Sequence, residues 1–152
     1  CSANEHQFCA WGAVKVALAI AKVPSKKVTK IVENARQICL DMLLSTDPAG
    51  AEYPHPSYAN KTSTSWFKFG FPVFYVTDVL QNLEALLALG LAGDERLRNA
   101  ITLVEEKQDA QGRWKMEYTY NGKMSVVIEE KKKPSKWVTL RALRVLKQYY
   151  SK

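Results

Sequence analysis

The chain has 152 residues, of which 22 are basic and 15 are acidic, giving a formal net charge of +7. Its length and its 47% hydrophobic content are ordinary for one globular domain with a sizeable core. No apolar run reaches the ~20 residues that a membrane-spanning helix needs, which argues against a transmembrane segment. The positive charge bears on solubility and on anionic partners rather than on the fold.

The cysteines indicate a reducing compartment. Cys1, Cys9 and Cys39 are an odd number and too sparse for a disulfide scaffold, so we expect a cytoplasmic location. No signal peptide is visible. Because an initiating Met is absent, we expect a processed or partial chain, the C-terminal part of a longer protein. Mature bacterial lipoproteins also begin with Cys, so a membrane anchor on Cys1 is the alternative.

The first 44 residues predict two helices of different kinds. Residues 10–22 are apolar almost all round, which predicts a buried helix. Pro24 then breaks the pattern, and Ser25 is expected to cap the next helix. That second helix has one apolar face and therefore lies on the outside of the fold. Its apolar positions are Val28, Ile31, Val32, Ala35, Ile38, Cys39, Met42 and Leu43.

Residues 45–75 lose the helical period and are rich in aromatic side chains. Proline and glycine punctuate this stretch, which predicts a long loop. We expect the loop to be ordered, because so many rings cannot stay exposed. The rings either pack the loop onto the core or line an apolar ligand cavity with their negative faces. The residues of this stretch that we consider for ligand binding are Trp66, Phe69, Phe71, Phe74 and Tyr75.

Three further helices follow. Residues 77–91 are apolar on most sides, with Thr77 or Asp78 near the start and Gly90 at the end. Asp94 is expected to cap a one-sided helix whose stripe is formed by Leu97, Ala100, Ile101 and Val104. Residues 135–150 return to the buried type. The polar positions of this last helix form one stripe, namely Arg141, Arg144, Gln148 and Ser151.

A small β-hairpin is predicted between the fourth and fifth helices, over residues 114–128. Trp114, Met116, Tyr118 and Tyr120 alternate with polar residues. Asn121-Gly122 is a favoured two-residue hairpin turn. The alternation then continues through Met124, Val126 and Ile128, which we expect to form the returning strand.

Buried and one-sided helices thus alternate, and residues 25–35 are weakly similar to residues 94–104, which indicates repeated helix pairs. Gln108, Gly112 and Trp114 fit the Gln-xxx-Gly-x-Trp pattern of QW repeats. From about Cys9 to Lys147 the chain therefore resembles the terpenoid cyclase/protein prenyltransferase superfamily, and most of all its squalene-cyclase-like prokaryotic members. The resemblance implies an all-α fold: one partial α/α toroid over residues 1–152, with about five helices in inner and outer pairs.

Both the residues themselves and the family resemblance indicate a structural role for the QW motif. Gly112 permits a tight turn, and Trp114 places a large ring beside the end of the preceding helix. The resemblance implies that the Gln108 side chain hydrogen-bonds near a helix end and that the Trp stacks on it. We assign Trp137, at the start of the last helix, to the same structural group.

The family chemistry is not evident in the sequence. Cyclases of this family use an Asp-rich motif, whereas the aspartates here are scattered at positions 41, 47, 78, 94 and 109. Prenyltransferases bind zinc through Asp, Cys and His, but Ser135 and Trp137 stand where a His is wanted. His6 and Cys9, with Cys1, are weak metal candidates near one end of the chain. We therefore expect no metal and no cofactor.

Asp78 is the acid that we single out. It is either the N-cap of a helix or, alternatively, a carboxyl facing the toroid cavity and able to act in catalysis. The function we expect is binding of an apolar, isoprenoid-like ligand or a protein partner, without cyclase or zinc chemistry. The first alternative is an enzyme subdomain completed by other segments or by another subunit.

The second alternative is a basic scaffold or interaction module. A partial ring also predicts self-association or additional flanking helices that cover its open edges. We expect no specific nucleic acid partner, and we interpret the basic groups as solvated helix faces and a charged loop, with an anionic surface as the alternative. These groups are Lys26, Lys27 and Lys30; Lys131 to Lys133 with Lys136; and Arg141, Arg144 and Lys147.

Overall fold

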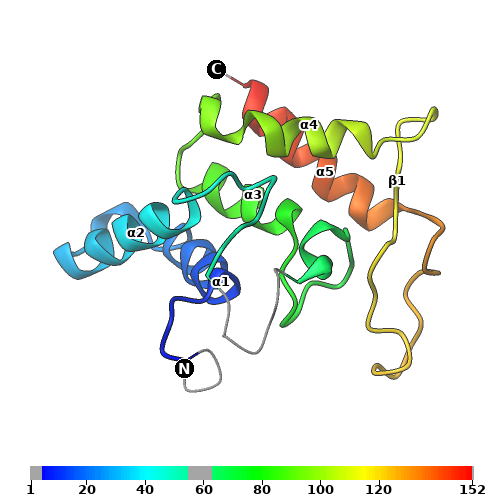
Figure 1. The fold of residues 1–152 in the computed structure, drawn as a ribbon, viewed down its shortest axis with the longest axis horizontal. Helices are drawn as coiled ribbons and strands as arrows, with labels where there is room; N and C mark the ends of the chain where they lie inside the picture. Colours follow the sequence, from blue (N-terminus) through cyan, green and yellow to red (C-terminus); the bar gives the residue numbers. More distant parts are fainter. Residues whose placement is uncertain (1–4, 55–62, 152) are drawn as a thin grey trace.

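The computed structural model describes residues 5–54 and 63–151, and in these ranges the chain is mostly helical with one small antiparallel hairpin (Figure 1). The all-α class with a hairpin is therefore confirmed. The helices are α1 (Ala10–Ile20), α2 (Lys30–Leu43), α3 (Val79–Ala88), α4 (Arg98–Glu106) and α5 (Lys136–Tyr150). Short 3₁₀ turns cover Ser25–Lys27, Thr64–Phe67 and Glu95–Leu97.

Helix α3 lies at the centre of the molecule. It packs against α1 on one side and α5 on the other, while α2 packs against α1 and α4 against α3 (Figure 1). Eight of its ten residues are buried, as its all-round apolar pattern predicts. Carbonyl oxygens at its C-terminal end accept hydrogen bonds from neighbouring helices, Leu87 from Gln148 at 2.9 Å and Leu89 from Arg36 at 2.8 Å. These bonds satisfy carbonyls that a helix end leaves without partners.

Helix α1 is less buried than its composition predicts. Val14 and Ala17 face the core, but Val16 is 46% exposed. Helix α2 begins later than expected, because Ser25 lies in a 3₁₀ turn and the cap is Thr29, whose hydroxyl accepts from the Val32 amide at 3.4 Å. The apolar face of α2 is also only partly buried, since Ile31 remains 80% exposed.

Helix α5 begins where the sequence predicts. Ser135 is its N-cap, with the hydroxyl accepting from the Val138 amide at 3.0 Å. The prediction for its polar stripe was wrong at one position. Arg141 does not face solvent but points into the core, where it is only 7% exposed. The solvent-facing side carries Leu140 and Leu143 instead.

The hairpin differs from the prediction in its returning strand. Strand β1 (Trp114–Lys115) pairs antiparallel with β2 (Pro134–Ser135), and residues 124–128 form no strand. The predicted turn at Asn121-Gly122 does form, with Gly122 at φ +83° and the Lys123 amide donating to the Tyr120 carbonyl at 2.9 Å. The residues after β1 pair with another segment, because the Glu117 and Tyr118 amides both donate to the Phe69 carbonyl at 2.8 and 3.1 Å.

No helix in the described parts of the chain is long and apolar enough to cross a membrane.

Candidate functional site

The QW motif forms a joint between α4, β1 and α5. Trp114 is fully buried, and its indole Nε1 donates to the Val104 carbonyl near the end of α4 at 2.6 Å. The Trp114 amide donates to the Thr139 hydroxyl on α5 at 3.1 Å. The indole thus satisfies an end carbonyl of one helix while the backbone of the same residue holds the next helix. Trp114 thus contacts both helices that flank the motif.

The turn before Trp114 is organised by Asp109. Its Oδ1 accepts from the amides of Gln111 at 3.0 Å and Arg113 at 2.9 Å. Gly112 has φ +75°, a conformation that favours glycine, and a Cβ there would lie 3.4 Å from Nε2 of Gln108. Gln108 itself is exposed, and its side-chain amide makes no hydrogen bond within the described part of the chain. The helix-end bond that the family resemblance implies for Gln108 is therefore not formed.

Asp78 caps α3, as one of the two interpretations predicts. Its Oδ1 accepts from the Gln81 amide at 2.7 Å, and its Oδ2 accepts from the Gly70 amide at 3.2 Å. Both carboxylate oxygens also accept from Arg141, at 3.1 Å from Nη2 and 3.3 Å from Nη1. The Asp78 carboxylate is thus the acceptor in four hydrogen bonds, two of which come from the charged guanidinium of Arg141.

Arg141 joins three separate segments in the core. Besides Asp78, it donates to both carboxylate oxygens of Glu84 at 2.9 Å and to the Gly70 carbonyl at 2.7 Å. These bonds use all five N–H groups of the guanidinium. Burial alone disfavours the charged form, but the carboxylates of Asp78 and Glu84 outweigh it and raise the pKa of Arg141 above its ordinary value. The group therefore stays charged and holds α3, α5 and the loop before α3 together.

Lys15 brings α1 into contact with this cluster. Its ammonium group donates to Oε1 of Gln81, which also accepts from the Thr77 hydroxyl at 3.2 Å. Burial lowers the pKa of Lys15 below its ordinary value; Asp78 and Glu84 oppose this shift and Arg141 adds to it. The cluster contains two cationic and two anionic side chains, so its formal charges balance.

This geometry limits what Asp78 can do in chemistry. A general acid must hold a proton that it can transfer to a substrate. Every hydrogen bond at Asp78 is instead accepted from a protein donor, and the carboxylate is almost fully buried between α3 and α5. In this arrangement Asp78 acts as a helix cap and as the partner of Arg141.

The aromatic residues expected to line a cavity are not brought together. Trp66 and Phe69 are buried in the core, and the Trp66 ring contacts Tyr53 edge to face at 5.2 Å. The other three rings contact three different segments. The Phe71 ring stacks on that of Trp137, with ring centroids 4.9 Å apart. The Tyr75 ring contacts Trp11 edge to face, with centroids 5.3 Å apart. The centroid of the Phe74 ring lies 5.1 Å from that of Tyr120. Tyr58, in the same sequence stretch, lies outside the described residues.

The other candidate acids and metal ligands are also separated. The scattered aspartates accept from separate partners, for example Asp41 from Gln37 at 2.7 Å within α2, and Asp47 from Asn99 at 2.6 Å, 52 positions later in the chain. His6 and Cys9 are exposed, and Cys1 lies outside the described residues. In residues 5–54 and 63–151, no three His, Cys, Asp or Glu side chains are grouped so that they could hold a metal ion.

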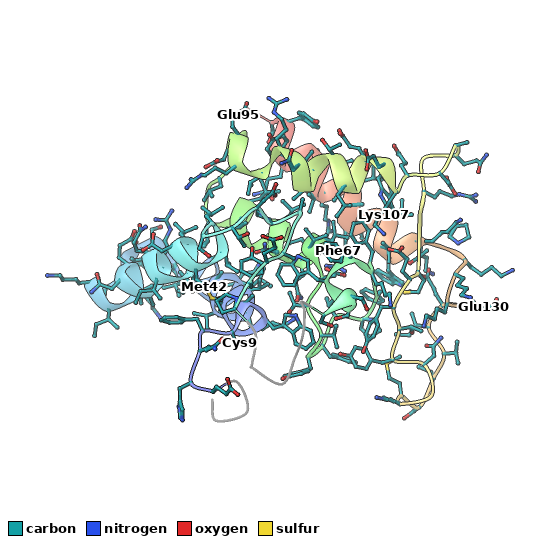
Figure 2. All side chains as sticks on the ribbon, viewed as in Figure 1. Cys9, Met42, Phe67, Glu95, Lys107 and Glu130 are labelled. Atoms are coloured by element: carbon teal, nitrogen blue, oxygen red, sulfur yellow. The ribbon has the colours of Figure 1, made fainter. Side chains whose placement is uncertain are left out.

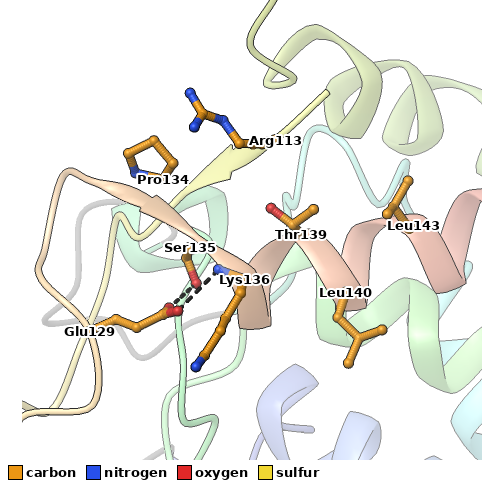
Figure 3. A pocket seen from close by; sticks show the side chains of 8 residues that line it. All are labelled: Arg113, Glu129, Pro134, Ser135, Lys136, Thr139, Leu140 and Leu143. Carbon is orange, nitrogen blue, oxygen red and sulfur yellow. Dashed lines mark hydrogen bonds between the residues drawn. The ribbon is translucent and has the colours of Figure 1, made fainter. Parts of the chain in front are cut away.

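A groove of about 530 Å³ lies between α5 and the hairpin (Figure 3). Its apolar wall comes from α5, where Leu140 is 39% and Leu143 is 47% exposed. Glu129 lies at one end, where its carboxylate accepts from the Ser135 hydroxyl and from the Lys136 amide at 3.0 Å. The groove is lined by Arg113, Glu129, Pro134, Ser135, Lys136, Thr139, Leu140 and Leu143.

Sequence reasoning missed both the groove and the partners of Asp78. A signal for Arg141 was present, because it occupies helical spacing with Val138, Ala142 and Val145, all of which are buried. No comparable signal marked Glu84 or Glu129, whose partners are distant in sequence or lie across a loop. The chain matches no protein-family model, no curated protein and no solved structure.

Proposed function

We propose that this chain is a non-catalytic binding domain of the terpenoid cyclase/prenyltransferase type, and that it holds an apolar, isoprenoid-like chain in the groove beside α5. The observation that carries the proposal is the pair of exposed leucines, Leu140 and Leu143, in that groove. Exposed apolar side chains inside a concave site indicate a ligand, because covering them removes apolar surface from water.

The helix arrangement supports the toroid-type fold. Helices α1, α3 and α5 form a row with α3 in the middle, and α2 and α4 pack outside it. This is the order expected if the odd-numbered helices are the inner members of successive pairs. The Trp114 joint, which connects an outer helix to the next inner one, fits the same arrangement.

The polar side chains of the groove suit an amphiphilic ligand. Lys136 is exposed on its wall, so its ammonium group is available to an anionic or hydroxyl head group. Arg113 is also exposed, but its guanidinium already pairs with Asp109 at 3.1 Å. Glu129 is already engaged by Ser135 and Lys136 and does not present a free carboxylate. An isoprenoid chain against Leu140 and Leu143, with its head group near Lys136, satisfies both parts of the site.

The absence of cyclase chemistry is proposed from the state of Asp78. A cyclase needs a carboxylic acid that donates a proton to an alkene, and Asp78 instead accepts two bonds from the charged Arg141. The groove lies on another side of α5, against the hairpin, and Asp78 does not line it. The proposed activity is therefore uptake of a ligand without its conversion.

The proposal is tested by titrating the protein with a farnesyl chain that carries a dansyl fluorophore and following the dansyl emission. We expect saturable binding. Leu143→Asp should weaken it about tenfold or more, because it places a charge against the apolar chain and removes an aliphatic contact. The matched control is Ile31→Asp, which makes the same kind of change at an exposed residue of α2.

Two outcomes would overturn the proposal. One is the lack of saturable binding by the unmodified chain. The other is equal binding by Leu143→Asp and Ile31→Asp, which would place the ligand elsewhere or show only general adsorption. Competition by a linear alkanol of the same length at equal strength would reject the isoprenoid preference.

A further inference from the structure

The net charge of this chain comes from one segment. Residues 113–147 carry ten of the 22 basic side chains and three of the 15 acidic ones, a net charge of +7. In the rest of the chain, basic and acidic side chains are equal in number. Arg141 is buried, and the other nine basic side chains of the segment are exposed. These nine are Arg113, Lys115, Lys123, Lys131, Lys132, Lys133, Lys136, Arg144 and Lys147.

Most of this charge is available to a partner. In the described parts of the chain, Arg113 is the only one of the nine that forms an ion pair, with Asp109 at 3.1 Å. Two of the three acidic residues are already engaged. Glu117 pairs with Lys107 at 2.7 Å, and Glu129 accepts from Ser135 and Lys136. The segment therefore presents cations that few carboxylates neutralise.

Apolar side chains accompany these cations in the loop of residues 123–133. Val126 is 65% exposed, Val127 is 67% exposed and Ile128 is 39% exposed. Lys123 precedes them and Lys131 to Lys133 follow them. Figures 1 and 2 show that the segment between β1 and β2, in which Glu130 lies, extends away from the helices. The 123–133 loop thus combines an exposed aliphatic tip with flanking lysines.

The combination of exposed aliphatic side chains and lysines favours one class of anionic partner over another. A nucleic acid uses lysines for its phosphates and aromatic rings for its bases, and it gains little from exposed valines. An anionic bilayer uses both kinds of side chain: aliphatic groups enter the boundary of the acyl chains, and lysines reach the head groups.

We propose that the 123–133 loop is a docking surface for an anionic lipid bilayer. Val126, Val127 and Ile128 enter the interface, and Lys131 to Lys133 contact acidic head groups. This inference stands independently of the ligand proposed for the groove, because the loop tip does not line that groove. It describes attachment to one face of a bilayer.

The test measures co-sedimentation of the full chain with vesicles of phosphatidylcholine, with and without phosphatidylserine, at low and high salt. We expect binding only with phosphatidylserine, and weaker binding at high salt. The triple variant Lys131→Gln, Lys132→Gln, Lys133→Gln should weaken it about a hundredfold. The matched control removes the same charge near the start of α2, with Lys26→Gln, Lys27→Gln and Lys30→Gln, and should change binding less than about threefold.

A second variant tests insertion separately from charge. Val126→Ser with Val127→Ser leaves the net charge unchanged and should still weaken vesicle binding at least tenfold. Equal losses from the two lysine triples would overturn the proposal, since they would show attraction by net charge alone. If the Val126→Ser, Val127→Ser variant binds vesicles as tightly as the unmodified chain, insertion of the loop into the bilayer would be overturned. Tighter binding to a single-stranded oligonucleotide than to vesicles would assign the surface to nucleic acid instead.

All substituted residues in these variants are exposed, so the melting temperature of each should match that of the unmodified chain. A variant that melts normally and still binds vesicles as tightly as the unmodified chain counts against the proposal.

Discussion

Arg141 and Asp78, which are 63 positions apart in the chain, form a buried two-point ion pair with distances of 3.1 and 3.3 Å. Asp78 is the cap of α3, and Arg141 lies in the middle of α5. The pair therefore connects the N-terminal end of the central helix, α3, to the middle of α5. The same guanidinium also binds Glu84 and the Gly70 carbonyl, so removing it takes the charged donor from two carboxylates and a donor from one backbone carbonyl.

Arg141→Met is expected to lower the free energy of unfolding by roughly 3–5 kcal/mol, because it leaves the Asp78 carboxylate buried and uncompensated. Urea unfolding followed by circular dichroism measures the change. Arg144→Met, at an exposed position of the same helix, is the control and should stay within about 0.5 kcal/mol. Similar losses in both variants would show that the buried ion pair is not what stabilises the α3–α5 contact.

Trp114→Ala should destabilise the protein by roughly 3–5 kcal/mol, because it leaves a cavity at a fully buried site. Trp114→Phe keeps most of the ring volume but leaves the Val104 carbonyl without its indole donor, so it should cost less, about 1–3 kcal/mol. The melting temperatures of the unmodified protein, Trp114→Phe and Trp114→Ala should fall in that order. An unchanged melting temperature in Trp114→Ala would contradict the role of this residue as a joint.

Two glycine substitutions should have effects of opposite sign. A Cβ at Gly70 would lie 2.7 Å from the Tyr118 carbonyl oxygen, and that backbone is held by the hydrogen bond from the Tyr118 amide to the Phe69 carbonyl. Gly70→Ala should therefore cost about 1–3 kcal/mol. Gly12 lies within α1, where a Cβ would have its nearest neighbour 3.8 Å away.

Gly12→Ala should accordingly stabilise the protein by roughly 0.5–1 kcal/mol, because alanine restricts the unfolded chain and favours the helix. Chemical denaturation of both variants under the same conditions measures the two changes. A loss in both would indicate that the space around Gly12 is tighter than its distances show.

Alkaline pH should destabilise the fold through Tyr53. Burial raises the pKa of Tyr53 above its ordinary value, the bond from Asn82 opposes the shift, and the nearby Asp47 adds to it. Between the ordinary pKa of ~10 and the raised value, the folded state binds more protons than the unfolded state. The contribution of Tyr53 is therefore complete below pH ~10 and is lost as the pH rises through the raised pKa.

Tyr53→Phe provides the comparison for this effect. It loses the hydroxyl bond to the Leu43 carbonyl, at 2.7 Å, and should be less stable by about 1 kcal/mol at neutral pH. Its stability should fall less steeply above pH ~10, as measured by urea unfolding at several pH values. Parallel slopes in the two proteins would assign the alkaline loss to other groups.

Local signals in the sequence predicted much of the helical framework. Asp78 is the cap of α3, as one of its two interpretations predicts, and α5 begins next to Ser135, where the sequence predicts the last helix. Trp114 is a large ring after a glycine turn, and its indole lies beside the end of α4, where the sequence places it. These predictions succeeded because the interactions that decide them lie within a few residues of each position, where propensity and spacing carry the information.

The failures came from long-range partners. Residues 114–128 alternate like a hairpin, yet the backbone at Glu117 and Tyr118 pairs with Phe69, about fifty positions earlier, and no local pattern reveals that competitor. Arg141 was assigned to a solvated stripe because its carboxylate partners lie on another helix. The groove depends on how the hairpin sits against α5, which the sequence of neither element determines alone.

The position of Arg141 also has a consequence for the order in which this protein folds during synthesis. The central helix is complete in sequence at Ala88, but one of its long sides is covered only by α5, which ends at Tyr150. Until α5 has left the ribosome, the nascent chain therefore carries α3 with that side open and with the Asp78 cap lacking its cation. Because contacts so distant in sequence form late, we expect this part of the nascent chain to be protected from proteases only after α5 has emerged.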